Sequence, residues 1–494
     1  MAEGSPRAPV PVRPFDVATT ASDSSATLLE HYKAAHASSK AYAAGARTRL
    51  SDNRNIANFS LTYKEACHPI VARHARKADA ASASDRDGSA SSSSGSCRVV
   101  DADGNEVIDM ACGFGAVLFG HNPPFVREAV LEMIRANACA LGFEHPIAER
   151  NAEKVCCLTG FDRCAFMTTG SEATALACRL CRAHTGRAKI VTFEGSYHGH
   201  FDGFLGRPVD ASAPDACFPV SPGIPEAYTR DLIVLPFDDE ASLDFLEARH
   251  AEIGGVFCEP VQNRRPCVVA APFLHRLREL TRRRGIVLVF DEVVTGFRVA
   301  AGGAQQALGV RCDLACYGKA LGGGYPVGCL AGARDLMDLA DGGGGGDVGG
   351  GGGRPRRGSH HAGTFDKHPL VMAATSAVLD HILARGDVLF EELNQLAASL
   401  AATLNAWWRE RGYELHLDHF CSMLRFIVPA SAAMAFFQTL NLHGVYCWEG
   451  RTCFLTTAHT PRDVELIVAA CQETTRQLLE HGISLASPSL QPSL

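Results

Sequence analysis

The sequence has neither a long apolar run nor an excess of positive charge. Its 494 residues include 47 lysines and arginines against 54 acidic residues, a net charge of −7, which gives no electrostatic reason to bind nucleic acid or an anionic membrane. No window approaches the roughly 20 apolar residues of a membrane-spanning helix. With 46% hydrophobic and 20% charged residues, the composition is that of a globular protein long enough for one large and one smaller domain.

Secretory and metal-binding patterns are also missing. The 19 cysteines are scattered through apolar segments and no secretory signal precedes them, so we expect reduced, buried thiols. Cys178 and Cys181 form a C-x-x-C pair, but no second cysteine or histidine pair stands at zinc spacing. The sequence therefore predicts no metal site and a cytoplasmic location, with organelle targeting left open.

Several segments have too few apolar residues to pack. Residues 1–25 are rich in Pro, Ala, Ser and Thr and predict a flexible tail; a cleaved organelle peptide is the alternative, although the acidic residues are unusual in one. Residues 79–96 and residues 341–360, the latter mostly glycine, predict mobile insertions, and residues 481–494 predict a second tail.

The middle of the chain alternates between short apolar runs and helix-length segments. This pattern is typical of an α/β fold with a mostly parallel, doubly wound sheet. The predicted strands cover residues 164–168, 189–193, 232–235, 254–258, 286–290 and 314–317.

The flanking segments complete the predicted organisation. An N-terminal segment, residues 26–112, contains a hairpin whose turn is the Asp-Gly-Asn sequence at 103–105. A large domain spans residues 113–340, and a small C-terminal domain spans residues 361–480.

Two residues in the predicted sheet suggest chemistry. Asp291 ends a β-branched, apolar strand, and the carboxyl ends of such strands are where open α/β sheets bind ligands. Lys319 follows the next strand and is itself followed by three glycines, which allow the backbone to close around whatever the lysine holds, a setting that suits a Schiff base. Considered separately, a strand-end aspartate is often a helix cap and a lysine beside glycines is often a solvated loop charge.

Together, the motifs D-E-V-V-T-G-F-R (291–298) and G-K-A-L-G-G-G-Y-P-V-G (318–328) resemble the pyridoxal-phosphate site of class III aminotransferases. The resemblance implies a fold-type I transferase, with a mostly parallel seven-stranded large domain and a smaller α+β C-terminal domain. It also implies that Lys319 binds pyridoxal 5'-phosphate and later moves the substrate proton. Asp291 would keep the pyridine nitrogen protonated, and Val293 would lie against the ring.

Three upstream motifs resemble further parts of that cofactor site. Gly170 and Ser171, in M-T-T-G-S-E-A-T, open a helix whose free N–H groups can bind the phosphate, although a glycine-serine pair there is usually only a cap. Tyr197, in Y-H-G, would stack on the ring, with His198 as a neighbour of undecided role; ordinary tyrosine packing is the alternative. Glu259, in E-P-V, would lie near the ring and Asp291.

A later motif implies a second subunit. G-T-F-D-K-H-P-L (363–370) resembles the family element whose threonine contacts the phosphate bound by the neighbouring subunit. Thr364 therefore implies a homodimer with shared active sites. His368 stands where the family usually has asparagine.

The subfamily is the finest distinction that the sequence offers. The chain is similar to glutamate-1-semialdehyde aminomutases, but stretches such as V-Q-N-R-R-P (261–266) resemble more closely the aminotransferase domains of hybrid polyketide and peptide synthetases. This second resemblance implies amino transfer from an amino acid to a β-ketoacyl thioester on an acyl carrier protein. The alternatives are a glutamate-1-semialdehyde 2,1-aminomutase and a pyridoxal-fold protein without catalysis. The Arg264–Arg265 pair and residues 448–451 could bind a donor carboxylate or a carrier's phosphate, or be exposed arginines without such a task.

Overall fold

The structure is a computed structural model that describes residues 25–46, 72–75, 95–210, 213–341, 358–447 and 450–485. Most of the predicted tails and of both predicted low-complexity insertions lies outside these residues, but residues 481–485 of the second tail are described and Leu485 is buried. Within the described residues, no helix combines the length and apolarity needed to cross a membrane.

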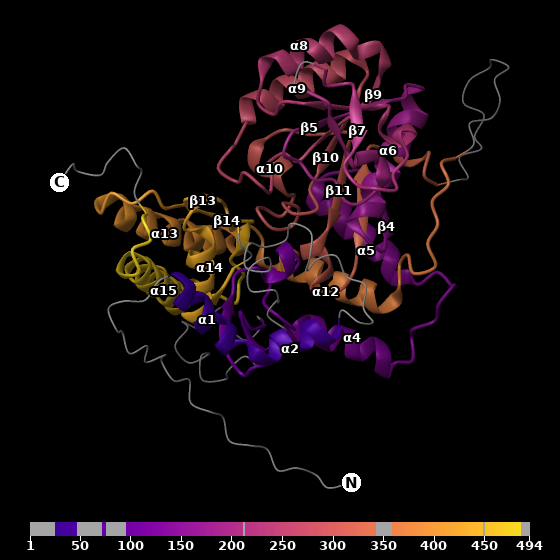
Figure 1. Cartoon of the computed structure of the whole chain (residues 1–494). Coiled ribbons are helices and arrows are strands. Elements are labelled where there is room, and N and C mark those ends of the chain that lie inside the picture. Colours follow the sequence, from indigo (N-terminus) through magenta and orange to yellow (C-terminus); the bar gives the residue numbers. More distant parts are fainter. Residues whose placement is uncertain are drawn as a thin grey trace, which may run out of the picture.

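A seven-stranded sheet forms the centre of the molecule (Figure 1). Its strands are β4 (Arg163–Met167), β5 (Lys189–Phe193), β8 (Leu232–Leu235), β9 (Ile253–Cys258), β10 (Val287–Asp291), β11 (Leu314–Gly318) and β12 (Gly328–Gly332). Their order is β4-β12-β11-β10-β9-β5-β8, and only β12 runs antiparallel to its neighbours. The predicted fold class, a mostly parallel seven-stranded sheet, is confirmed.

Helices cover both faces of this sheet, because alternate side chains of the buried strands point to opposite sides. Val289 on one face belongs to the same buried cluster as Ala177 of α6, whereas Leu288 on the other face belongs with Leu277 of α9. The helices of this part are α4 (Pro124–Arg135), α5 (Pro146–Thr159), α6 (Gly170–Thr185), α7 (Glu226–Thr229), α8 (Glu240–Arg249), α9 (Ala271–Arg284), α10 (Ala304–Leu308), α11 (Arg334–Met337) and α12 (Pro369–Arg385). A short hairpin of β6 (Gly206–Pro208) and β7 (Cys217–Pro219) precedes α7.

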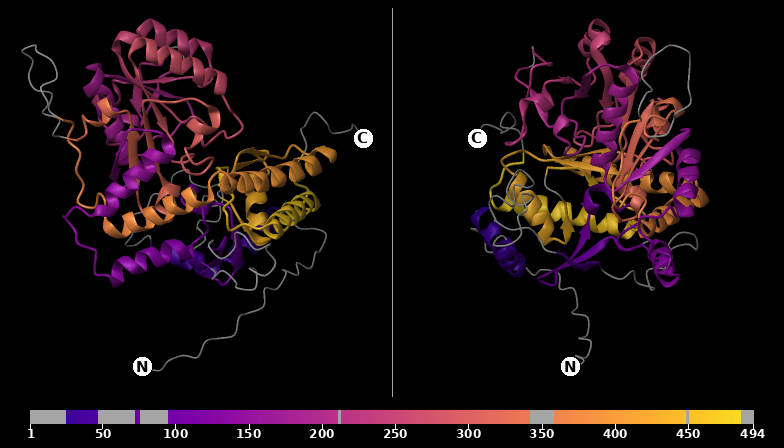
Figure 2. Two further views of the ribbon diagram at one scale, coloured as in Figure 1. Left: turned by 180° about the vertical axis from the view of Figure 1, so that it is seen from behind. Right: turned by 90° about the vertical axis from the view of Figure 1, so that its right-hand side faces the viewer.

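The N-terminal segment packs on the C-terminal part of the chain. The predicted hairpin forms β2 (Arg98–Asp101) and β3 (Glu106–Asp109), and β3 pairs in parallel with β15 (Val445–Tyr446). Helix α1 (Ser25–Ala35) contacts α14 (Ala433–Leu442), and Figure 2 shows the indigo and yellow helices side by side. The remaining elements are α2 (Ala37–Ala46), β1 (Ala72–Ala75), α13 (Val388–Glu410), β13 (His416–Phe420), β14 (Met423–Ile427), β16 (Cys453–Phe454) and α15 (Pro461–Glu480).

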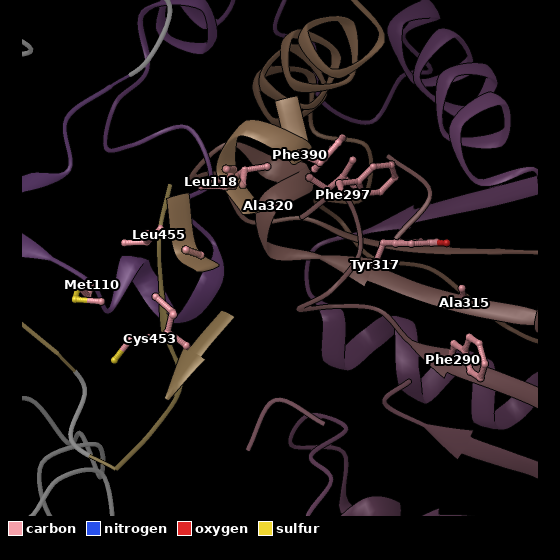
Figure 3. Packing of buried hydrophobic residues seen from close by; sticks show 14 of the residues in the cluster. Met110, Leu118, Phe290, Phe297, Ala315, Tyr317, Ala320, Phe390, Cys453 and Leu455 are labelled. Atoms are coloured by element: carbon pink, nitrogen blue, oxygen red, sulfur yellow. The ribbon is translucent and has the colours of Figure 1, made fainter. Parts of the chain in front are cut away.

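Arg298 joins these parts from a fully buried position. Its guanidinium donates to the carbonyl oxygens of Gly115, Val117 and Leu455, and it lies 4.8 Å from the ring of Phe454. No carboxylate pairs with it within the described part of the chain, and burial lowers the pKa of Arg298 to about 10. The main buried cluster runs from Phe290 and Ala315 in the sheet to Cys453 and Leu455 in the C-terminal part (Figure 3), whereas Phe454 belongs to a separate, smaller cluster.

We expect Arg298→Met to destabilise the fold by at least about 3 kcal/mol, because the carbonyl oxygens of Gly115, Val117 and Leu455 would lose their donor. Thermal unfolding of the purified protein measures this loss. Arg282→Met, on the exposed side of α9, removes the same charge without these contacts and should leave the melting temperature unchanged within about a degree. Equal melting temperatures for the two variants would contradict the role given to Arg298.

Candidate functional site

A cavity of about 520 Å³ opens at the carboxyl ends of β10 and β11, beside the N-terminus of α6. Eight of the predicted site residues line it: Gly170, Ser171, Tyr197, His198, Glu259, Asp291, Val293 and Lys319. They come from separate motifs, and the parallel sheet brings these motifs to one edge. The structure therefore places all predicted site residues except Thr364 around one space.

Asp291 is held in place by its neighbours. His198 Nδ1 lies 2.8 Å from Asp291 Oδ2, and the backbone N–H of Val293 donates to Asp291 Oδ1 at 3.1 Å. The side chains of His198 and Asp291 are almost fully buried. Since the carboxylate can only accept, His198 donates from Nδ1 and holds the Asp291 side chain in place.

Lys319 combines strain with a shifted pKa. Its backbone adopts φ 45°, in the left-handed region that residues other than glycine rarely occupy, and such strain is common at functional sites. Burial lowers the pKa of Lys319, whereas the nearby carboxylates of Asp291 and Glu259 act in the opposite direction. A lysine with a lowered pKa has more neutral amine, the form that can act as a nucleophile or base near neutral pH.

Glu259 braces the loops on both sides of the cavity. Its two carboxylate oxygens accept from the backbone N–H groups of Tyr197, at 2.8 Å, and Asn263, at 2.9 Å. Burial, and secondarily the charge of Asp291, raises the pKa of Glu259. Glu259 thus fixes the segments that carry Tyr197 and Asn263.

Neighbouring segments pack closely against the N-terminus of α6. Thr169 is its N-cap and forms a capping box with Glu172, so that the helix itself uses the N–H of Glu172. A β-carbon on Gly199 would lie 2.4 Å from Ser171 Oγ, and one on Gly170 would lie 3.0 Å from the Val293 methyl groups. Only glycine fits at Gly199, and the Gly170 and Ser171 N–H groups stay available for an anion.

Thr364 lies apart from the other predicted residues. It is exposed, on the turn that precedes α12, and it does not line the cavity. The sequence predicts that Thr364 contacts the phosphate bound by a neighbouring subunit, and an exposed position outside this chain's own cavity is compatible with that prediction. Of the two arginines singled out, Arg265 is engaged: its guanidinium binds Gln262 Oε1, at 2.9 Å from Nε, and Glu194 O. Trp448 lies outside the described residues.

Some residues of the site were not predicted. Asn263, Thr169 and Tyr325 also line the cavity, and Arg425 contacts the Arg264 carbonyl from β14. Thr169, Asn263 and Tyr325 lie inside the motifs at 167–174, 261–266 and 318–328, but the sequence alone assigned them no role. Arg425 lies far away in the sequence, in a strand with no distinctive motif, so no local signal identifies it.

The residues fit pyridoxal phosphate, the cofactor that the sequence motifs imply. A phosphate suits the free N–H groups at Gly170 and Ser171, and a buried carboxylate on Asp291 suits a protonated ring nitrogen. His198 Nε2 is a buried polar atom without a hydrogen-bond partner among the described residues. The side chain of Tyr197 is 54% exposed, so that its ring is free to cover a planar group. In the part of the chain that the structure describes, no group of three His, Cys, Asp or Glu side chains could hold a metal ion.

Comparison with known proteins gives a consistent result. The model of the family described as aminotransferase class-III matches residues 83–449. The chain is 35% identical over 401 residues to the glutamate-1-semialdehyde 2,1-aminomutase of Thermomicrobium roseum, covering 77% of this chain and 89% of that protein. The corresponding enzyme of Methanopyrus kandleri is 35% identical over 404 residues, with the same coverage of 77% and 89%.

Solved structures with the same fold include transaminases. The β-phenylalanine aminotransferase of Variovorax paradoxus superimposes with a TM-score of 0.75 at 25% identity, covering 94% of this chain and 98% of that chain. An omega-transaminase from Sphaerobacter thermophilus gives 0.73 at 26% identity, covering 91% and 98%.

Proposed function

Because the chain belongs to the class III aminotransferases, we propose that it moves an amino group from an amino acid donor to a keto acceptor, with Lys319 and Asp291 as its catalytic residues. It is an enzyme that depends on pyridoxal 5'-phosphate. The observation that carries the proposal is the convergence of Lys319, Asp291 and the N-terminus of α6 on one cavity.

Different residues around the cavity would have different tasks in this reaction. When bound, the cofactor supplies an electron-withdrawing ring that accepts the electron pair released as a proton leaves the substrate's amino carbon. The carboxylate of Asp291, which accepts a hydrogen bond from His198, would keep the ring nitrogen protonated. The N–H groups of Gly170 and Ser171 would hold the phosphate, and Tyr197 and Val293 would enclose the ring.

Lys319 has two tasks. Its Nζ would hold the cofactor, and as a free amine it would remove a proton from the substrate's amino carbon as a general base and pass that proton on as a general acid. Both tasks need a neutral amine. The lowered pKa of Lys319 supports this assignment, because Nζ then loses its proton at a lower pH. The rate should accordingly rise with pH as Nζ loses its proton.

We further propose that the acceptor is a β-ketoacyl thioester on an acyl carrier protein. The stretch 261–266, which resembles the synthetase-embedded aminotransferases, supports this acceptor. The second candidate is a glutamate-1-semialdehyde 2,1-aminomutase, which the 35% identity to enzymes of that name favours.

The fate of nitrogen distinguishes the two candidates. A transaminase passes donor nitrogen to a different molecule. An aminomutase converts its substrate into an isomer and needs no separate amino donor. With ¹⁵N-glutamate or ¹⁵N-glutamine as donor, we expect label in the β-aminoacyl product, as measured by mass spectrometry. Conversion of glutamate-1-semialdehyde to 5-aminolevulinate without any donor, together with no label in acyl carriers, would establish the second candidate instead.

We also propose that the enzyme is a homodimer in which Thr364 reaches the phosphate bound by the partner. Two segments near Thr364 support this proposal, because they lie together and expose large apolar side chains. Lys367 Nζ lies 2.6 Å from Glu144 Oε1, and beside this pair Phe143 is 81% exposed and Phe365 is 56% exposed. A second copy of the chain would cover these rings.

We expect sedimentation to give twice the chain mass, and Thr364→Ala to weaken cofactor affinity about 10-fold to 100-fold by loss of a hydrogen bond to a charged group. Mixing Thr364→Ala with inactive Lys319→Ala subunits provides the control. One site of the mixed dimer would then combine an intact Lys319 with an intact Thr364, so wild-type affinity should return at that site. A fully active monomer, or no recovery on mixing, would argue against shared sites.

A further inference from the structure

We propose that Arg298 is a positioning residue for amino-group transfer, and that its guanidinium holds the turn Cys112–Gly115, which leads into one wall of the cofactor cavity. This role rests on the proposed function for the reaction itself. Arg298 does not line the cavity. It therefore acts on the reaction through the groups that it holds and through its charge.

The turn Cys112–Gly115 has a strained backbone. Its four residues all have a positive φ, at 47°, 57°, 60° and 91° in chain order, and two of them are not glycine. Side chains make this left-handed conformation costly, so it persists only where the surrounding contacts impose it, and such strain is common at functional sites. The next residue, Ala116, lines the cofactor cavity. The path of the turn thus sets the position of this wall.

Arg298 fixes the end of this turn. Its Nη2 donates to the carbonyl oxygens of Gly115, at 3.1 Å, and Val117, at 3.0 Å, which lie on either side of Ala116. Its Nη1 donates to the Leu455 carbonyl oxygen at 3.1 Å, so that the turn is tied to the C-terminal part. A planar guanidinium makes these contacts in fixed directions, and an ammonium group cannot reproduce all of them.

Different contacts fix the start of the turn. Asp109 Oδ1 accepts from the backbone N–H groups of Ala111, at 2.8 Å, and Cys112, at 3.0 Å. Asp109 Oδ2 lies 2.7 Å from His121 Nε2. Loss of the Arg298 guanidinium would therefore release only the end of the turn, which is the end next to the cavity.

The charge of Arg298 acts on Lys319 as well. Arg298 is fully buried, where a charge influences its neighbours more strongly than it would in water. Burial is the main cause of the lowered pKa of Lys319, and the charge of Arg298 lowers that pKa further. This influence needs the charge but not the hydrogen bonds to the turn. The contacts and the charge of Arg298 are thus two contributions that substitutions can separate.

Arg298→Lys keeps the charge and loses the planar donor. The N–H groups of Ala116 and Val117 donate back to carbonyl oxygens of the turn, so amide hydrogen exchange reports whether the turn is held. In the holoenzyme we expect exchange in residues 110–118 to become about tenfold faster, because hydrogen bonds that hold the turn are lost. KM for glutamate as donor should rise about tenfold and kcat should change less than about twofold, since the wall contacts the substrate away from the reacting atoms.

Arg298→Gln keeps hydrogen-bond donors and loses the charge. KM should rise as in Arg298→Lys. The pH at which the rate rises should move to a higher value, because Lys319 Nζ then keeps its proton to a higher pH. In Arg298→Lys this pH should equal that of the wild-type protein. An equal pH in Arg298→Gln and Arg298→Lys would remove the charge from the proposed role.

Arg187→Lys is the matched control. The guanidinium of Arg187 also donates to backbone carbonyl oxygens, among them those of Ile253, at 3.2 Å, and Gly285, at 3.0 Å. These contacts lie at the amino ends of β9 and β10, on the edge of the sheet opposite the cavity. Arg187→Lys should therefore lower the melting temperature but leave the exchange of residues 110–118, KM and the pH dependence unchanged.

Ala116→Leu tests the wall without changing the guanidinium, and so keeps a test available if the Arg298 variants do not fold. It should raise KM for glutamate about tenfold at an unchanged pH dependence. Unchanged KM in Ala116→Leu, or unchanged KM or unchanged hydrogen exchange in a folded Arg298→Lys, would overturn the proposal. Failure of the proposed function would be recognised separately, by the labelling experiment on the wild-type protein.

Discussion

Replacing Lys319 with alanine is expected to abolish amino-group transfer and to remove the visible absorbance of cofactor bound to that lysine. The loss should be at least about 10⁴-fold in rate, because both the covalent attachment and the proton transfer depend on the same Nζ. The strained backbone at φ 45° supports this expectation, because a merely solvated lysine would not require such a conformation. Single-turnover kinetics and absorbance spectra measure both effects.

Two controls make the Lys319 result specific. Lys189→Ala, at the start of β5 outside the cavity, should retain the spectrum and the rate. Adding a small primary amine to Lys319→Ala should restore part of the activity, since the free amine can take over the proton transfer. Wild-type turnover in Lys319→Ala would remove this residue from the mechanism.

Replacing Asp291 with asparagine is expected to lower the rate by several powers of ten while the fold is kept. An unprotonated pyridine is a poor electron sink, and each tenfold loss corresponds to about 1.4 kcal/mol of transition-state stabilisation. Asparagine can still accept the hydrogen bond that His198 donates to Asp291 at 2.8 Å, so the local structure should survive. Circular dichroism and steady-state kinetics separate the two effects.

A cofactor analogue methylated at the ring nitrogen gives the sharper control for Asp291. Its ring is cationic whatever residue faces it, so that Asp291→Asn loaded with this analogue should recover much of the lost rate. If the loss is mild, or if the analogue recovers nothing, Asp291 acts as a structural cap and not through the ring nitrogen.

Much of the fold followed from the sequence because the central strands are buried on both faces. Their apolar runs are continuous and bounded by helix-length segments, and all six predicted strands are present within one or two residues. The seventh strand, β12, was not among them. Its sequence G-C-L-A-G has no β-branched residue. At Gly328 a side chain is excluded, since a β-carbon there would lie only 2.1 Å from the Thr169 carbonyl oxygen. The close approach of the Thr169 backbone thus requires glycine at a position where a β-branched residue would have indicated a strand.

The site was predictable where each residue belongs to a short motif at a strand or helix end. Asp291, Lys319, Gly170 and Glu259 all have this property, and the structure brings them to one cavity. Contacts between distant segments were not predictable. The guanidinium of Arg425 meets the Arg264 carbonyl across a sequence separation of 161 residues, and only the folded chain reveals it.

Reduction with borohydride followed by peptide mass spectrometry tests the central claim most directly. Borohydride makes the bond between lysine and cofactor permanent, so the modified lysine can be identified in a protease digest. We expect a single pyridoxyl-phosphate mass increment on the peptide that contains Lys319, and none when excess amino donor has first released the lysine. An increment on a different lysine, or no covalent cofactor in a folded protein saturated with it, would contradict the account.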